Sequence, residues 1–335
     1  MAPFDSLARP LKALRVSITD RCNFRCPYCM PRGDVGGVSK FLDCDEFLSF
    51  EEIIRLVKIF VALGVVKVRL TGGEPLLRDN LVSLIAGLKQ ISGLREVAMT
   101  TNGSLLRNMV GSLKEVGLDR LTVSLNSLDQ DRFQASSDSG ISVNNILCAL
   151  EDAKAVGFKN IKLNCVLRRG VNDIDILPLA AFARENGYTV RFIEFMDVGT
   201  KNSWCLDSVV PAVEVATILS GQWPAERVWR SGTNCVAQHW KYLDGAGEFG
   251  LIASVTEPFC ADCDRARLSA GGLLYTCLFA SECLDLKTLM RSGMPTEDLL
   301  TLLETHWIMR SDRYSEIRSK RTVGSPRAEM FHLGG

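Results

Sequence analysis

The sequence predicts an α/β protein: a partial, open (β/α) barrel of six units followed by a smaller C-terminal α+β region. Between about residue 13 and residue 196, short runs rich in β-branched residues alternate with amphipathic stretches. Short connections between such segments produce parallel βα units, and six units are too few for a closed eight-stranded barrel. Past residue 197 the alternation stops. We therefore expect a barrel over 1–197 and an appended region over 198–335.

The elements of the barrel can be assigned in order along the chain. Strands are expected at Leu14–Thr19, Val65–Thr71, Glu96–Thr100, Leu121–Ser124, Ile161–Val166 and Thr189–Phe195. Helices are expected at Glu51–Leu63, Asn80–Gln90, Leu105–Val116, Val143–Val156 and Ile174–Glu185, and in the second region at Leu284–Arg291 and Thr296–Thr305. Ser49 and Glu52 form a capping-box pattern before the first helix, and Gly64 marks its end. An active site is expected at the carboxyl ends of the strands.

Composition excludes several classes of function. The 335 residues have a formal net charge of zero, so no overall field attracts nucleic acid or an anionic membrane. No apolar run is long enough to span a bilayer, and the first ten residues lack the apolar segment of a secretory signal. We expect a cytoplasmic protein. Any anionic substrate must be held by cations placed locally.

Six of the twelve cysteines form two triplets, and the first triplet follows the first expected strand. Cys22, Cys26 and Cys29 lie within eight residues, and no fourth cysteine or histidine stands near them to complete a structural zinc site. A [4Fe–4S] cluster held by three thiolates would leave one iron open to an outside molecule. A structural zinc site is the alternative interpretation.

The second triplet is Cys260, Cys263 and Cys277, and its spacing is compatible with two kinds of metal site. One is a zinc ribbon with Cys283 as its fourth ligand, and the other is a second iron–sulfur cluster with an open iron. The spacing alone leaves both open.

Cations recur on the expected strands. Lys67 and Arg69 are two residues apart, so their side chains share one face of the second strand. Inside a barrel such charges are costly unless an anion meets them. Further cations stand on the first, fifth and sixth strands and beside the second triplet: Arg15, Lys162, Arg191, Arg265 and Arg267. The set predicts a site for an anionic ligand; a solvated face of an edge strand is the alternative interpretation of the Lys67–Arg69 pair.

Several segments together resemble known families. The spacing Cys22-x3-Cys26-x-Tyr28-Cys29, with Thr71-Gly72-Gly73-Glu74-Pro75, Thr100-Thr101-Asn102-Gly103 and Ser124-Leu125-Asn126, is similar to the radical S-adenosylmethionine enzymes. Three later segments resemble the GTP 3′,8-cyclase family of molybdenum-cofactor biosynthesis: Cys260-x2-Cys263-x13-Cys277 with Arg265-x-Arg267, the stretch 191–199, and the terminal Gly334-Gly335. The resemblance covers nearly the whole chain.

The resemblance implies a lyase that converts GTP to 3′,8-cyclo-7,8-dihydroguanosine 5′-triphosphate by a 5′-deoxyadenosyl radical, the first step of molybdenum-cofactor synthesis. It implies two [4Fe–4S] clusters, one on each triplet, and S-adenosylmethionine. Its contacts to S-adenosylmethionine fall on Tyr28, Gly73, Glu74, Ser124, Asn126 and Met196. Its contacts to GTP fall on Arg15, Lys67, Arg69, Thr100, Lys162, Arg191, Arg265 and Arg267. Arg15 is expected to assist the final reduction, and the Gly334-Gly335 tail to reach into the active site.

The resemblance also implies partners: an electron donor, a second copy of the chain in a homodimer, and cyclic pyranopterin monophosphate synthase as the recipient of the product. Two other classes stay open. One is another two-cluster radical enzyme, such as a peptide maturase, which typically carries more C-terminal cysteines. The other is a zinc-binding scaffold without catalysis.

Overall fold

A single curved sheet organises the molecule. The computed structural model describes residues 2–32, 41–229, 236–318 and 327–334. Within them the sheet has 12 strands in the order β12-β11-β10-β1-β2-β3-β4-β5-β6-β9-β8-β7. The strands are β1 (Ala13–Ser17), β2 (Lys67–Thr71), β3 (Glu96–Thr101), β4 (Arg120–Ser124), β5 (Lys162–Leu167), β6 (Thr189–Glu194), β7 (Ala225–Val228), β8 (Gln238–Tyr242), β9 (Glu248–Ile252), β10 (Arg265–Leu268), β11 (Leu273–Tyr275) and β12 (Leu284–Asp285). Its centre is parallel and its two ends are antiparallel.

The parallel centre is the predicted six-unit barrel, which the structure confirms. β1 to β6 pair in sequence order, and β10 and β9 add parallel strands outside β1 and β6. Antiparallel pairing of β11 and β12 on one side, and of β8 and β7 on the other, ends the sheet. The C-terminal region therefore supplies both flanks of the sheet that the N-terminal region begins. The boundary at 197/198 stays a prediction.

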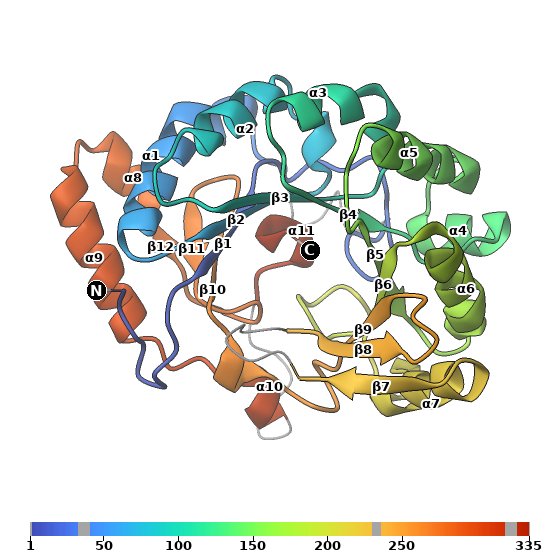
Figure 1. Cartoon of the computed structure of the whole chain (residues 1–335). Helices are drawn as coiled ribbons and strands as arrows, with labels where there is room; N and C mark the ends of the chain where they lie inside the picture. Colours follow the sequence, from blue (N-terminus) through green and yellow to red (C-terminus); the bar gives the residue numbers. More distant parts are fainter. Residues whose placement is uncertain (1, 33–40, 230–235, 319–326, 335) are drawn as a thin grey trace.

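Most of the helices lie on the convex face of the sheet (Figure 1). The helices of the described residues are α1 (Phe50–Ala62), α2 (Leu81–Lys89), α3 (Val110–Glu115), α4 (Gln130–Ser137), α5 (Val143–Ala155), α6 (Ile176–Asn186), α7 (Ala212–Gln222), α8 (Leu286–Arg291), α9 (Thr296–Ile308), α10 (Tyr314–Ile317) and α11 (Met330–Leu333). The expected capping box at α1 is present: the Ser49 hydroxyl accepts from the Glu52 amide at 3.2 Å, and Glu52 Oε2 accepts from the Ser49 amide at 2.8 Å. This reciprocal pair satisfies two amides at the start of the helix.

Two helices of the barrel differ from the expectation, and α10 and α11 lie where no helix was expected. The stretch expected as one helix at Leu105–Val116 is a short 3₁₀ turn, Leu106–Asn108, followed by α3. The helix α4 was not expected, because its sequence is polar and lacks an apolar stripe; Asp129 caps it by accepting from the Arg132 amide. None of the described helices is long and apolar enough to cross a membrane.

The strands divide their side chains between the two faces of the sheet. On β2, Val68 and Leu70 are fully buried beneath the helices, whereas Lys67 and Arg69 face the enclosed side. Closed barrels of this type fill their interior with packed branched side chains. Here the concave side carries cations and small polar groups, so it bounds a cavity, and α11 with the C-terminus lies inside the curve of the sheet (Figure 1).

Candidate functional site

A cavity of about 400 Å³ lies on the concave side of the sheet, and almost every residue predicted for the site lines it. The lining includes Cys22, Cys26, Cys29, Cys260, Cys263, Cys277, Tyr28, Gly73, Ser124, Asn126, Met196, Arg15, Lys67, Arg69, Thr100, Lys162, Arg191, Arg265 and Arg267. The two triplets are over two hundred residues apart in the sequence and open into the same space. Folding therefore joins the two predicted metal sites and the predicted anion site into one.

The first triplet is held by a turn after β1. The amides of Cys29 and Met30 both donate to the Cys26 carbonyl at 2.9 Å. The Cys22 sulfur accepts from the Phe24 amide at 3.4 Å and lies 3.9 Å from the Asn102 side-chain nitrogen. Burial raises the pKa of Cys22 to about 11 and that of Cys26 to about 12. Burial in this loop thus favours the neutral thiols, and binding a metal centre would deprotonate them.

Tyr28 and Asn126 form the wall beside this triplet. The Asn126 side-chain nitrogen Nδ2 donates to the Tyr28 hydroxyl at 3.0 Å, and the side-chain oxygen Oδ1 accepts from the Val166 backbone amide at 3.0 Å. Asn126 follows β4, and Val166 belongs to β5, so the hydrogen bonds fix the orientation of Tyr28 against two strands. Tyr28 and Asn126 line the cavity together with Cys26 and Cys29.

Glu74 is the predicted ligand residue that does not line the cavity. Its carboxylate is completely buried behind the wall and accepts from the Thr101 hydroxyl at 2.6 Å, the Asn102 amide at 2.6 Å and the Leu76 amide at 3.1 Å. Glu74 therefore holds the loop after β3, which includes the Asn102 side chain near Cys22. The structure places it to position that loop.

Gly73 does line the cavity, and its lack of a side chain has a local cause. A Cβ at this position would overlap the Arg21 carbonyl. The Gly73 and Glu74 amides donate to the carbonyls of Thr19 and Arg21 at 2.8 Å each. The turn after β2 therefore packs directly on the backbone that leads into the first triplet.

The second triplet sits on a 3₁₀ turn, Cys260–Asp262, and on the segment after β11. The Cys277 sulfur accepts from the Phe279 amide at 3.4 Å. Burial alone would raise the pKa of Cys263, but the nearby positive charges of Arg265 and Arg310 outweigh it and lower this pKa to about 7. A thiolate at Cys263 is therefore already favoured by the fold.

The donors present fit iron–sulfur clusters at both triplets. Each set consists of reduced thiols that are partly exposed to one shared cavity, and in each set a backbone amide donates to a sulfur. In the part of the chain that the structure describes, no three His, Cys, Asp or Glu side chains converge as a single metal ion would require. Cys283, the candidate fourth ligand of a zinc ribbon, is exposed and does not line the cavity. Three thiolates that face open space suit a cluster with one unligated iron.

A row of guanidinium groups crosses the floor of the cavity. Arg15 on β1 is in register with Arg267 on β10 and with Arg69 on β2. Like charges directly opposite one another on neighbouring strands are destabilising. Burial, and then the charges of Arg267, Arg265, Arg69 and Arg191, depress the pKa of Arg15 well below its ordinary value. These guanidinium groups therefore repel one another, and a bound polyanion would offset the repulsion.

The other cations of the site differ in how they are held. Lys67 forms an ion pair with Glu96 at 2.5 Å, so it is partly neutralised. Arg69 donates to the Thr100 and Thr122 hydroxyls at 3.2 and 3.1 Å. Burial, with the charge of Arg191 next, lowers the pKa of Lys162 to about 7.

Asn164 is a site residue that sequence reasoning missed. Its side-chain oxygen accepts from Arg191 Nε at 2.9 Å across β5 and β6, and it lines the cavity. An asparagine within a strand gives no signal by itself. Only the strand register reveals that it faces a buried guanidinium.

The C-terminal tail enters the barrel, as expected for Gly334. Arg267 donates to the Gly334 carbonyl at 3.2 Å, and Leu333 is completely buried. Glu329 fixes the start of this segment, since it accepts from the Thr200 amide and hydroxyl at 3.1 and 2.8 Å. Gly335, the other predicted tail residue, lies outside the described residues.

Comparison with known proteins agrees with this geometry. The sequence profile of the Radical SAM superfamily matches residues 16–183, and that of Molybdenum Cofactor Synthesis C matches residues 188–316. The GTP 3′,8-cyclase of Acidothermus cellulolyticus is 48% identical over 325 residues, which are 96% of this chain and 90% of that protein. The GTP 3′,8-cyclase of Xanthomonas axonopodis pv. citri is 45% identical over 331 residues, 99% of this chain and 98% of that one.

A solved structure with the same fold is that of Streptococcus suis SuiB bound to S-adenosylmethionine. Its TM-score is 0.65 at 15% identity, and the match covers 95% of this chain and 69% of that one. At this identity the likeness establishes the fold alone. The sequence identity to the cyclases over nearly the whole chain establishes more: the chain belongs to the GTP 3′,8-cyclase family of the radical SAM superfamily.

Proposed function

We propose that this protein is a GTP 3′,8-cyclase that isomerises GTP to 3′,8-cyclo-7,8-dihydroguanosine 5′-triphosphate, the first step of molybdenum-cofactor synthesis. The observation that carries the proposal is the single cavity in which two cysteine triplets face one row of buried cations. A cluster site alone would need no such row. A triphosphate site alone would need no thiols.

We assign the two ends of the cavity as follows. Cys22, Cys26 and Cys29 hold the first [4Fe–4S] cluster, and Tyr28, Gly73, Ser124, Asn126 and Met196 surround S-adenosylmethionine beside it. When bound, this cluster and S-adenosylmethionine supply the 5′-deoxyadenosyl radical with which the reaction begins. The remaining predicted ligand, Glu74, acts by fixing the Thr101–Asn102 loop.

Cys260, Cys263 and Cys277 hold the second cluster at the other end, where its open iron would meet the purine. Between the two, Arg15, Lys67, Arg69, Thr100, Lys162, Arg191, Arg265 and Arg267 bind GTP. Charge-assisted hydrogen bonds from several guanidinium groups fix a triphosphate in position as well as neutralise it. Holding the ribose at a defined distance from the radical source is the main contribution that such a site can make.

Residues of the C-terminal tail also exclude water from the site. Gly334 and the buried Leu333 occupy the inside of the curve, and Arg267 ties this tail to the cation row. Exclusion of water protects reactive intermediates from side reactions. Arg15 is the central cation of the row and the residue we assign to assist the final reduction.

The wider setting is part of the proposal. We infer a cytoplasmic homodimer with 1–197 as the radical-forming part and 198–335 as the substrate-anchoring part, supplied by a one-electron donor and passing its product to cyclic pyranopterin monophosphate synthase. The free cysteines throughout the described residues suit a reducing compartment.

An anaerobic turnover with reconstituted protein, S-adenosylmethionine, dithionite and GTP tests the function, with mass spectrometry as the readout. We expect GTP-dependent 5′-deoxyadenosine and a product of the same mass as GTP. Cleavage of S-adenosylmethionine with GTP unchanged would favour another two-cluster radical enzyme. An absence of cleavage in protein that holds about eight irons per chain would overturn the proposal.

A further inference from the structure

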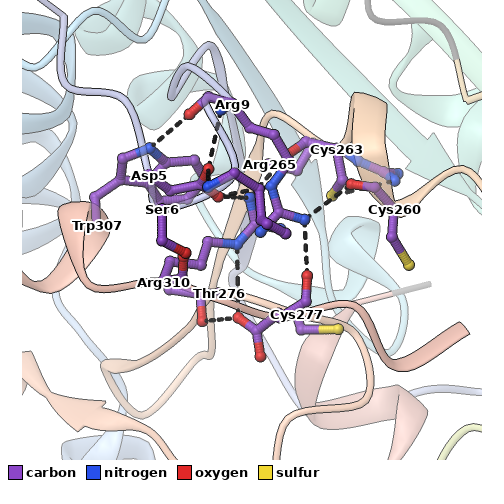
Figure 2. A network of polar contacts seen from close by, with 12 residues as sticks. Asp5, Ser6, Arg9, Cys260, Cys263, Arg265, Thr276, Cys277, Trp307 and Arg310 are labelled. Atoms are coloured by element: carbon purple, nitrogen blue, oxygen red, sulfur yellow. Dashed lines mark hydrogen bonds and ion pairs between the residues drawn. The ribbon is translucent and has the colours of Figure 1, made fainter. Parts of the chain in front are cut away.

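Residues 5–9 pack against the loop of the second cysteine triplet, although about 250 residues separate the two in the sequence. Figure 2 shows how Asp5 and Arg9 of this N-terminal segment, and Arg310 just after α9, contact one another and the backbone of Cys260 and Cys263. The three cysteine sulfurs lie on the side of this group away from Asp5 and Arg9. The function proposed above uses none of these three charged residues.

Two arginines each hold one ligand residue of the second triplet by its carbonyl. Arg9 donates through Nη1 to the Cys260 carbonyl at 2.8 Å, and Arg310 donates through Nη1 to the Cys263 carbonyl at 2.8 Å. Arg9 also donates to the Asp312 carbonyl at 2.7 Å. The backbone of both cysteines is thereby fixed by side chains that do not themselves line the cavity.

Asp5 links the two arginines. Its Oδ2 accepts from Arg9 Nε at 2.6 Å and from Arg310 Nη1 at 3.2 Å, while its Oδ1 accepts from the Leu7 and Arg9 amides. All three side chains are at most 2% exposed. Buried charges are strongly destabilising when a partner is lost, so the three groups hold one another in a single arrangement.

The surroundings make the arrangement rigid. The Trp307 indole donates to the Arg9 carbonyl at 3.2 Å, and the Arg310 guanidinium lies 4.5 Å from the centre of the Trp307 ring. The Ser6 hydroxyl donates to the Arg310 carbonyl at 2.6 Å. The network also reaches Cys277 indirectly, because Thr276 donates to Asp312, which lies 3.5 Å from Arg310 Nε.

We propose that Asp5, Arg9 and Arg310 are positioning residues for the second iron–sulfur cluster: they set the spacing of its ligands and the charge next to it. The inference rests on the proposed function, because it takes the second triplet as cluster ligands. Groups that hold metal ligands from outside typically change metal affinity or activity about 10- to 100-fold when they are mutated. The first triplet has no contact with this network among the described hydrogen bonds.

The first test measures cluster retention. Arg9→Met and Arg310→Met are reconstituted anaerobically and exposed to an iron chelator, and iron per chain is followed against the electron paramagnetic resonance signals of the two clusters. We expect the second cluster to be lost about 10- to 100-fold faster than in the unmutated protein. The signal of the first cluster, and its change on addition of S-adenosylmethionine, should stay as they are.

The matched control is Arg291→Met. Arg291 forms an ion pair with Glu52 at 2.8 Å and donates to the carbonyls of Asp45 and Phe47, so it also ties segments together, but it is 44% exposed and does not line the cavity. Equal loss of the second cluster in Arg291→Met would mean that general destabilisation is the cause, and would overturn the proposal.

The second test separates charge from scaffolding by measuring the reduction potential of the second cluster. Reduction adds negative charge, so removing a nearby cation should lower the potential, and removing the Asp5 carboxylate should raise it. We expect Arg9→Met and Asp5→Asn to shift the potential in opposite directions, and Arg9→Lys to restore most of the unmutated value. A purely structural role would give no such opposition of sign.

The outcomes distinguish this inference from the proposed function. If the unmutated protein binds only about four irons per chain, the two-cluster function fails. If it binds about eight, and the variants retain the second cluster at the unmutated rate with unchanged potentials, only the positioning role fails. Should Arg9→Met not fold, Arg310→Met and Asp5→Asn carry the same two measurements.

Discussion

Among the cations of the site, Lys162 has a pKa that lies close to neutral pH. Its pKa of about 7 results first from burial and then from the charges of Arg191, Arg120, Lys67 and Arg69. An unfolded chain would protonate this amine up to its ordinary pKa of 10.5. Between these two values the unfolded state binds more protons than the folded state, so Lys162 makes stability rise with pH.

Replacing Lys162 with methionine should remove this dependence. We expect Lys162→Met to be more stable than the unmutated protein at pH 6.5, and the difference to shrink as the pH rises from 7 towards 10. Urea unfolding of the GTP-free protein across this range provides the measurement. A constant difference would show that Lys162 does not titrate there. With GTP bound, the phosphates should raise the pKa of Lys162 and weaken the pH dependence.

Among the elements, α11 and the tail behind it depend most on a single backbone position. Gly334 has φ of +71° and its carbonyl accepts from Arg267. A Cβ there would overlap the Thr71 hydroxyl on β2, a strand of the barrel wall. The tail can therefore lie inside the barrel only with glycine at this position.

Gly334→Ala should displace the tail and lower turnover while both clusters are retained. The matched control is Gly187→Ala at the end of α6, where φ is +72° but an added Cβ would meet no atom within 4 Å. Gly187→Ala introduces the same backbone strain as Gly334→Ala but no steric overlap. Turnover and iron content of the two variants give the comparison, and equal turnover in both would exclude a role for the close approach of the tail.

At the scale of the whole molecule, the protein has no net charge but concentrates cations on one concave surface. Burial and mutual repulsion depress the pKa of Arg69 to about 10, of Arg191 to about 9 and of Arg267 to about 10. Each lowered pKa means that holding these charges together destabilises the folded state. A bound polyanion should remove this repulsion and so stabilise the protein.

GTP should therefore raise the thermal midpoint of the reconstituted protein, and guanosine should raise it much less. A ligand present at one hundred times its dissociation constant stabilises by about 2.7 kcal/mol. Thermal unfolding with each ligand, with inorganic triphosphate as a third, measures the effect. A rise of the same size with guanosine and none with triphosphate would place the binding energy in the base and contradict the role of the cation row.

Local patterns in the sequence were sufficient for the elements and for the chemistry of the ligands. The alternation of strands and helices predicted β1 to β6 within a few residues, because each strand buries apolar side chains against a helix that follows it. The triplets and the Lys67–Arg69 pair were predictable because ligand spacing and strand period are properties of adjacent residues. The helix α4 was not predicted, because its polar sequence has no apolar stripe.

Only the tertiary structure decided what depends on segments far apart in the chain. Strand register brought Arg15 between Arg267 and Arg69, and Asn164 opposite Arg191. Packing turned Glu74 away from the cavity and into hydrogen bonds with the Thr101–Asn102 loop. The contact of Arg9 with Cys260 likewise has no local signature. The sequence by itself determined which groups could bind metal and phosphate; long-range packing decided which of them face one cavity and which hold the others in place.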